Sequence, residues 1–214
     1  MKVLLSVLAA ALTALALPAV AAGSGVDALS GFYERVDSFQ AHFKQSQVDE
    51  DGEILQTSSG NFLLSRPARF RWEYLKPYEQ IIASNGKVFR FYDVDLAQVT
   101  VRDIDDSLRA TPALLLSGGA ALEDEFSISA AGQREGLVWV RLIPRDQEGD
   151  FKEIRMGFDG DSPVRMELDD NLGQSTQIQF SDVEVNAKIP ASRFELNIPD
   201  GVEIVDGRAA TQNP

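Results

Sequence analysis

The sequence contains no cysteine and only one histidine, His42. A chain without cysteine forms no disulfide, and one imidazole cannot build a histidine-rich metal centre. The sequence also lacks a G-x-S-x-G turn and a glycine-rich phosphate loop. Acid pairs such as Asp93/Asp95 and Asp105/Asp106 lie at expected turns, where Asp is common for local reasons. We therefore expect a protein that is not an enzyme and needs no cofactor or metal.

Positive charge is scarce: 20 Lys and Arg stand against 33 Asp and Glu, for a formal net charge of −13. An acidic surface repels phosphate backbones and anionic headgroups, so nucleic acid and membrane surfaces are not expected partners. No linker rich in Pro, Gly or Ser divides the 214 residues. We expect one domain over residues 23–206, a disordered tail over 207–214, and a monomer.

Charged residues are nearly absent from the first 22 positions, MKVLLSVLAAALTALALPAVAA. One Lys, an apolar run and small residues at its end form the layout of a secretory signal peptide, cleaved after Ala21 or after Ala22. An uncleaved membrane anchor is the alternative, because the run is nearly long enough to span a bilayer. No cysteine follows that could be acylated, so we expect a soluble protein without a stable membrane anchor in the periplasm of a Gram-negative bacterium.

Residues 26–46 carry the clearest helical pattern. Apolar residues recur there at spacings of three and four, which predicts one amphipathic helix. Ser24 and Asp27, three positions apart, are typical of a capping pair in front of a helix. The apolar face of this predicted lid helix consists of Leu29, Phe32, Val36, Phe39 and Phe43.

Most of the remaining chain indicates β-strands, because apolar and polar residues alternate. The predicted strands cover residues 53–65, 69–75, 79–84, 87–92, 96–102, 126–130, 137–143, 152–158, 163–169 and 175–181. Short helices are expected within 104–117, and Asn85-Gly86 is a strong hairpin signal. A sheet of about ten strands should curl. The prediction is a mainly β (α+β) fold with one large, strongly curved antiparallel sheet. If this sheet curls into an unclosed barrel, the N-terminal helix and the short helices are available to cover its concave face.

The stretch RPARFRWEYLKPYEQ, residues 66–80, puts Phe70, Trp72 and Tyr74 at alternate positions. This predicts a strand with one aromatic face, which can be an ordinary core or the wall of a cavity. Arg66 lies at the entrance of this strand. If its guanidinium points inward it needs acceptors, and the exposed carbonyls at a helix end would make it a latch for the covering helix. The alternative is an Arg exposed at a strand edge.

Four motifs follow one another along the chain. They are the R-P-x-x-F-R-W-x-Y run from Arg66, the N-G-K hairpin from Asn85, the D-L-x-Q-V-T-V strand from Asp95 and the T-P-x-x-L-L helix start at Thr111. Together they resemble the LolA family of periplasmic outer-membrane lipoprotein carriers, over roughly 30–200. The resemblance implies a half-barrel with a lidded hydrophobic interior. It also implies a carrier that accepts acylated lipoproteins from an inner-membrane ABC transporter, LolCDE, and delivers them to an outer-membrane acceptor, LolB.

The resemblance also implies roles for single residues. Arg66 is expected to bond to the lid helices, and Phe70 is associated with cargo transfer. Two residues depart from the family pattern. The family often has Lys where this chain has Ser65, and often has Trp where this chain has Arg90. Arg90 could therefore narrow the cavity or lie at its mouth. LolB-like acceptors share the fold but carry an acylated cysteine, which this chain lacks. The expected wall of the acyl cavity is Phe62, Leu64, Phe70, Trp72, Tyr74, Phe89, Phe91, Leu114 and Leu115.

The predicted strands are also consistent with a second class of function. A β-sheet protein with a filled core could bind another protein on its surface and carry no acyl cargo. Such a module would have no accessible apolar cavity, so cargo binding distinguishes the two classes.

Overall fold

The computed structural model describes residues 24–103, 112–117, 122–146 and 150–208. The helices within these ranges are α1 (Gly25–Arg35), α2 (Pro112–Ser117), α3 (Leu122–Glu125) and the 3-10 helix η2 (Ala191–Phe194). The strands are β1 (Ser38–Val48), β2 (Ile54–Ser65), β3 (Arg69–Lys76), β4 (Gln80–Asn85), β5 (Val88–Asp93), β6 (Gln98–Asp103), β7 (Phe126–Arg134), β8 (Leu137–Pro144), β9 (Phe151–Asp159), β10 (Ser162–Asp170), β11 (Ser175–Val185) and β12 (Glu203–Asp206). The predicted signal peptide, with Ala21 and Ala22, and positions 209–214 of the predicted tail lie outside the described residues. None of the helices described is long and apolar enough to cross a bilayer.

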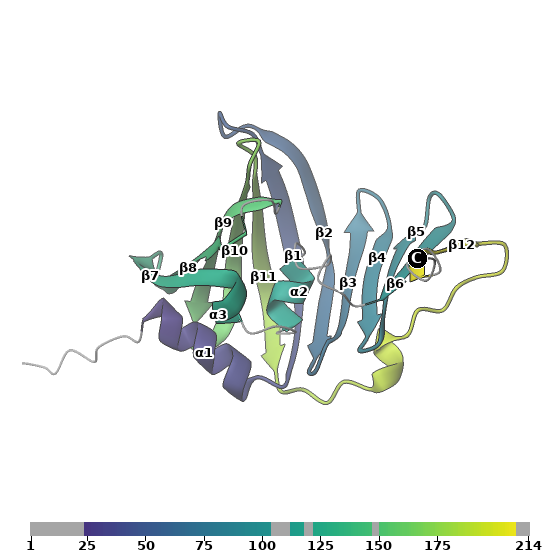
Figure 1. Ribbon diagram of the computed structural model, residues 1–214, viewed down its shortest axis with the longest axis horizontal. Coiled ribbons are helices and arrows are strands. Elements are labelled where there is room, and N and C mark those ends of the chain that lie inside the picture. Colours follow the sequence, from purple (N-terminus) through teal and green to yellow (C-terminus); the bar gives the residue numbers. More distant parts are fainter. Residues whose placement is uncertain (1–23, 104–111, 118–121, 147–149, 209–214) are drawn as a thin grey trace, which may run out of the picture.

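The twelve strands form one sheet in the order β12-β6-β5-β4-β3-β2-β1-β11-β10-β9-β8-β7. Neighbouring strands are antiparallel, except that β12 runs parallel to β6. The two outermost strands, β7 and β12, lie at opposite ends of this order, so the sheet is not closed (Figure 1). The predicted unclosed, mainly antiparallel fold is therefore confirmed.

The first helix begins where the sequence predicts but is shorter. The Asp27 backbone N–H donates to the Ser24 hydroxyl at 3.2 Å, and the Ser24 N–H donates to the Asp27 carboxylate at 2.9 Å, which forms a capping box. The predicted helix over 26–46 is wrong beyond the end of α1. Phe39 and Phe43 lie not on a lid helix but on β1, which pairs with β2 and β11. A spacing of four keeps residues on one face of a strand as well as of a helix, so these positions fit both.

The other predicted strands occur as β2 to β11, with ends that differ by a few residues. The helix expected within 104–117 occurs as α2 over its last residues, and 104–111 lie outside the described part of the chain. The short strand β12 was not predicted. It lines up with β6 through the pair Glu203 and Gln98, which are far apart in the sequence.

The main core lies on one face of the sheet, under α1 and α2 (Figure 1). On β3, Phe70 and Trp72 point into it and are each 1% exposed. Arg71 and Glu73 alternate with them on the other face and form an ion pair at 2.8 Å. The predicted aromatic face of this strand is therefore an inner face, and its cations lie outside.

A second, smaller cluster covers the opposite face of β5 and β6. Tyr92, Val99 and Val101 are buried there against Leu196 and Ile198 of the segment after η2. Arg90 pairs with Val101 in the sheet, so it lies on this outer side and not in the wall of the main core. The expectation that Arg90 narrows the cavity is wrong.

Candidate functional site

Aromatic rings fill the centre of the main core. The ring of Trp72 lies 4.7 Å from that of Phe43, 4.8 Å from that of Phe62 and 6.0 Å from that of Phe180, measured between centroids. Phe32 of α1 joins them through Phe39, at 6.0 Å and nearly edge-to-face. We call this set the aromatic interior; it consists of Phe32, Phe39, Phe43, Phe62, Trp72, Tyr74 and Phe180.

The predicted wall and lid residues meet in one cluster. Those with described side chains are Leu29, Phe32, Val36, Phe39, Phe43, Phe62, Leu64, Phe70, Trp72, Tyr74, Phe89, Phe91 and Leu115, and all belong to it. The Leu114 side chain lies outside the described part of the structure. Sequence reasoning missed Phe180, Phe158 and Met156, although the alternation on the predicted strands that carry them would have placed them inside.

The aromatic interior is closed in this conformation. Phe39, Phe62 and Leu64 are each 0% exposed. These side chains are therefore not accessible to a ligand in this conformation.

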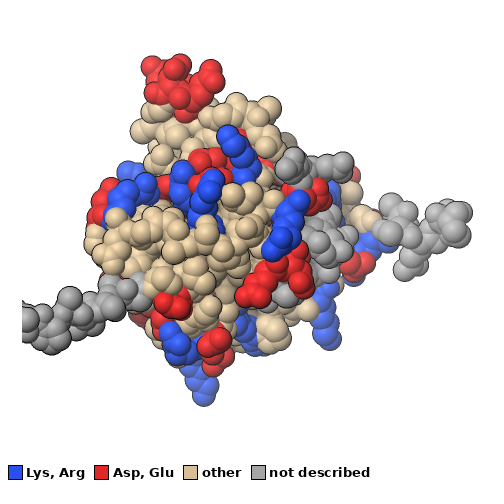
Figure 2. All heavy atoms as spheres, turned by 60° about the vertical axis from the view of Figure 1, so that its left-hand side comes forward, with Lys and Arg blue, Asp and Glu red and all other residues tan. Residues whose placement is uncertain are grey.

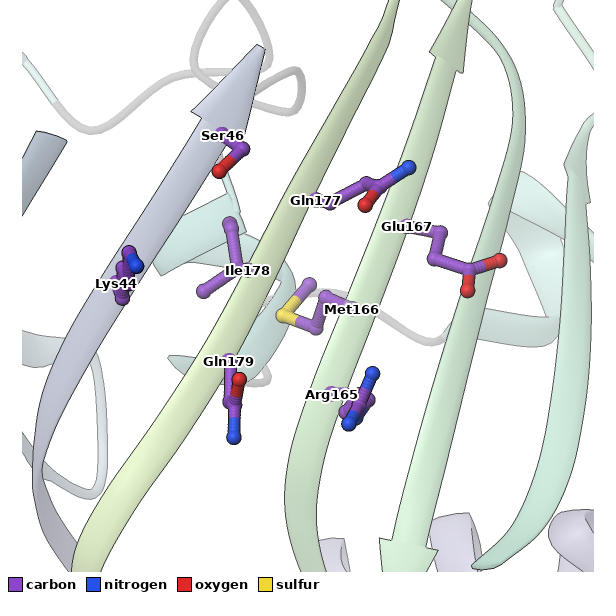
Figure 3. A pocket seen from close by; sticks show the side chains of 8 residues that line it. All are labelled: Lys44, Ser46, Arg165, Met166, Glu167, Gln177, Ile178 and Gln179. Carbon is purple, nitrogen blue, oxygen red and sulfur yellow. The ribbon is translucent and has the colours of Figure 1, made fainter. Parts of the chain in front are cut away.

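A pocket of about 150 Å³ lies elsewhere, on the outer side of β1, β10 and β11 (Figure 3). Polar side chains surround it, and its lining residues are Lys44, Ser46, Arg165, Met166, Glu167, Gln177, Ile178 and Gln179. An apolar chain would gain little there, because the lining is mainly charged or amide. This pocket is therefore not a candidate site for a lipid.

Arg66 connects the ends of two helices. Its Nε donates to the carbonyl of Val36, the C-cap of α1, at 2.8 Å. Its Nη1 donates at 2.6 Å to the carbonyl of Ser117, the last residue of α2. Carbonyls at a helix end lack intrahelical donors, and the negative end of the helix dipole favours a cation there. Of the two orientations that the sequence left open, the guanidinium has the inward one.

The charge of Arg66 lies among rings and is partly buried. Its guanidinium carbon is 4.9 Å from the ring centroid of Phe32 and 4.8 Å from that of Tyr33. Burial lowers the pKa of Arg66, while Tyr33 and Asp37 act in the opposite direction. Arg keeps its proton in proteins, so the group remains a charged donor at neutral pH.

Tyr33 forms a second link between the helices, which sequence reasoning missed. Its hydroxyl donates to the carbonyl of Leu115 in α2. Burial raises the pKa of this hydroxyl, with Arg66 opposing the shift, so it is protonated and able to donate at neutral pH. Tyr33 and Arg66 thus bond to neighbouring carbonyls in the last turn of α2.

The end of α1 is also attached directly to the sheet. Arg35 forms two contacts of 2.7 Å with the Asp161 carboxylate, in the turn between β9 and β10. The Asn186 side chain donates to the Arg35 carbonyl at 2.9 Å and accepts from the Asp37 N–H at 2.8 Å. Together with the bond from Arg66, these contacts tie the point where α1 joins β1 to three separate parts of the fold.

The fold and the site together define an open β-barrel with an aromatic interior under a helical cover. The chain belongs to the LolA family, whose profile, described as outer membrane lipoprotein carrier protein LolA, matches residues 34–197. An outer-membrane lipoprotein carrier protein from Methylococcus capsulatus is 43% identical over 84% of this chain and 86% of its own length. One from Dechloromonas aromatica is 38% identical over 96% of this chain and 98% of its own.

A solved structure also shares the fold. An uncharacterised conserved protein from Thermus thermophilus matches with a TM-score of 0.56 at 14% identity. The match covers 85% of this chain and 96% of that chain.

Proposed function

We propose that this protein is a soluble periplasmic carrier that binds the acyl chains of lipoproteins in its aromatic interior. The observation that carries the proposal is a closed apolar interior whose two covering helices are joined by Arg66. Its relatives are named outer-membrane lipoprotein carrier proteins, which supports the same cargo. The role needs no catalytic residue, in line with a protein that is not an enzyme.

The energetics of the cargo favour a carrier with a movable cover. Each methylene removed from water contributes about 0.8 kcal/mol, so a long acyl chain in water costs roughly 10 kcal/mol. A cover that closes over the empty interior competes with cargo and keeps the net affinity moderate. It also hides apolar surface that would otherwise promote aggregation. In this scheme Arg66 is the latch of the cover, and Phe70 acts in cargo transfer.

The proposed cycle has two partners and begins with export. After removal of the signal peptide, cleaved after Ala21 or Ala22, the domain over 23–206 receives lipoproteins from an inner-membrane ABC transporter of the LolCDE type. It carries them as a monomer to an outer-membrane acceptor of the LolB type. The chain has no cysteine that could carry an acyl anchor, which supports the mobile role over that of the acceptor.

Cargo loading tests the proposal. The mature protein is offered one lipoprotein, acylated or unacylated, by the transporter with ATP in detergent-free buffer. A soluble complex with the acylated form alone is the expected result. Equal recovery of both forms would indicate a chaperone for protein surfaces. Recovery of neither, with active transporter and cargo, would favour a filled-core interaction module.

A further inference from the structure

Large apolar side chains are exposed mainly at one end of the sheet. Because β1/β2, β3/β4, β5/β6 and β10/β11 are antiparallel pairs in one sheet, the four turns that join them lie at the same end. We call residues 49–55, 75–79, 94–97 and 171–174 the hairpin rim. Nine large apolar residues are exposed in the described chain, and six lie on this rim: Ile54, Leu55, Leu75, Tyr78, Leu96 and Leu172.

The exposure of these side chains is extensive. Leu172 is 82% exposed, Leu96 72% and Ile54 66%. Apolar side chains scattered singly need no explanation, but a gathering at one end of a molecule is typical of an interaction surface. These side chains do not pack in the hydrophobic core, because each lies at or beside a turn, beyond the buried part of its strand.

Neighbouring tips of the rim contact one another. The side chain of Gln47, on β1 just before the rim, donates to that of Gln174 at 3.0 Å, which joins the end of β1 to the β10–β11 tip. The Val94 N–H donates to the Glu79 carbonyl at 3.2 Å, which joins the β5–β6 tip to the β3–β4 tip. The rim is therefore built from two connected pairs of tips.

The hairpin rim has a strong excess of negative charge. It carries six acids, namely Asp49, Glu50, Asp51, Glu53, Glu79 and Asp95, and one base, Lys76. Figure 2 shows acidic side chains at the top of the molecule, the end at which Figure 1 places the β1–β2 turn. Such a surface repels anionic lipid headgroups and attracts a basic protein surface.

We propose that the hairpin rim is the docking surface for a partner protein that presents Lys and Arg beside apolar pockets. The inference rests on the proposed function, which supplies two candidates: the inner-membrane transporter and the outer-membrane acceptor. The turn that carries Arg66 joins β2 to β3 at the opposite end of the sheet. A partner on the rim therefore leaves Arg66 and its bonds to the cover uncontacted.

Matched variants of the full mature chain test the docking surface. The probes are the purified transporter, the soluble part of the acceptor, and vesicles of phosphatidylethanolamine and phosphatidylglycerol. The double variant Ile54→Ser/Leu172→Ser should bind at least one of the two proteins tenfold or more weakly. Val185→Ser, an exposed apolar residue at the far end of β11, should stay within twofold of the wild type.

Charge variants give an independent readout. Glu50→Lys/Asp51→Lys should slow association with the same partner, and added salt should weaken wild-type binding. Glu184→Lys, at the far end of the same sheet, is the control. Binding of both proteins within twofold of the wild type by both double variants would overturn the inference. Wild-type binding to the vesicles that Ile54→Ser/Leu172→Ser abolishes would replace the protein partner with a membrane surface.

A separate experiment distinguishes failure of the carrier proposal from failure of the docking surface. A synthetic diacylated lipopeptide, offered without any partner protein, should bind the wild type and the rim variants equally. If the wild type does not bind it, the carrier proposal fails whatever the rim does. Normal lipopeptide binding with unchanged partner binding in the rim variants counts against the docking surface alone.

Discussion

Arg66 is the residue on which the cover most depends, because one charged group bonds to the ends of two helices. The carbonyls of Val36 and Ser117 lie where an α-helix leaves its acceptors without intrahelical donors. Leu is neutral and shorter than Arg, and it donates no hydrogen bond. The closed state would then lose the charged donor that joins the ends of the two helices.

Arg66→Leu is therefore predicted to loosen the cover. A buried polar group left without its partner costs about 1–3 kcal/mol, so the free energy of unfolding should fall by about 3 kcal/mol. Amide hydrogen exchange should accelerate in both α1 and α2. The variant should also fail to complete the cycle of cargo acceptance and release, which transfer from transporter to acceptor measures.

Arg71→Leu is the matched control. Arg71 lies on the outer face of β3, where it pairs with Glu73. Its replacement should leave exchange in the two helices unchanged. Normal cargo cycling in Arg66→Leu, with protected helices, would contradict a latch at this position.

At the scale of elements, α1 and α2 are held differently. The end of α1 is fixed by Arg35 and Asn186 as well as by Arg66. For α2, Tyr33 and Arg66 bond to carbonyls of its last turn. We therefore expect α2 to open more readily than α1.

Tyr33→Phe tests this order by removing one oxygen atom. The Leu115 carbonyl loses its donor, so the free energy of opening should fall by about 1 kcal/mol. Exchange should accelerate in residues 112–117 more than in 25–35. Asn186→Ala, which frees the end of α1, should produce the reverse pattern. Equal acceleration of both helices in both variants would mean that they move as one body.

A close approach between β2 and β3 leaves no room for a side chain at Gly60. A Cβ atom at this position would lie 1.8 Å from the Glu73 carbonyl oxygen and 3.0 Å from the Phe43 ring. Gly60→Ala should thus lower the free energy of unfolding by about 1–3 kcal/mol, as overpacking does. Urea unfolding measures this loss. Thr57→Ala, on the exposed part of β2, should have a small effect, and an equally small effect of Gly60→Ala would show that the strands separate easily.

The sequence predicts elements where local chemistry is decisive. The alternation in 69–75 and the Asn85-Gly86 turn place β3, β4 and β5 correctly. The helix predicted for Phe39 and Phe43 is wrong because their spacing satisfies both periods. Pairing with β2 and with the distant β11 decides for a strand. The kind of acceptor for Arg66, a helix-end carbonyl, follows from its chemistry. Which two helices supply it depends on the tertiary fold, as does the contact from Tyr33 to Leu115.

For the whole molecule, an open sheet has an outer face that must be stabilised without a second layer of helices. Over β5 and β6 the chain uses the segment after η2 and a small apolar cluster. Over the other half it uses ion pairs across strands. Arg141 of β8 contacts Glu153 of β9 at 2.6 Å, and Arg155 of β9 contacts Glu167 of β10 at 2.8 Å. Part of the dependence of stability on pH should therefore arise from these ion pairs.

The expected direction follows from Glu153. The hydrogen bond from Arg141 holds the pKa of this carboxyl below its ordinary value of 4.5, against the opposing effect of burial. A lowered folded-state pKa contributes stability above the unfolded value, and this is lost as the pH falls through the folded value. Glu153→Gln should lower the free energy of unfolding by about 1 kcal/mol at pH 7.

Urea unfolding of the wild type and of Glu153→Gln between pH 7 and pH 3 measures this contribution. The difference between the two should begin to shrink below pH 4.5. It should disappear once the pH has fallen through the lower folded-state pKa of Glu153, because both side chains are then uncharged. If the difference in the free energy of unfolding persists at pH 3, the loss in Glu153→Gln comes from packing and not from charge. The same series on Val99→Ala, which shortens a buried side chain of the apolar cluster over β5 and β6, should show no comparable change with pH. A matching decline there would mean that acid weakens the sheet as a whole and not through the charged half of its outer face.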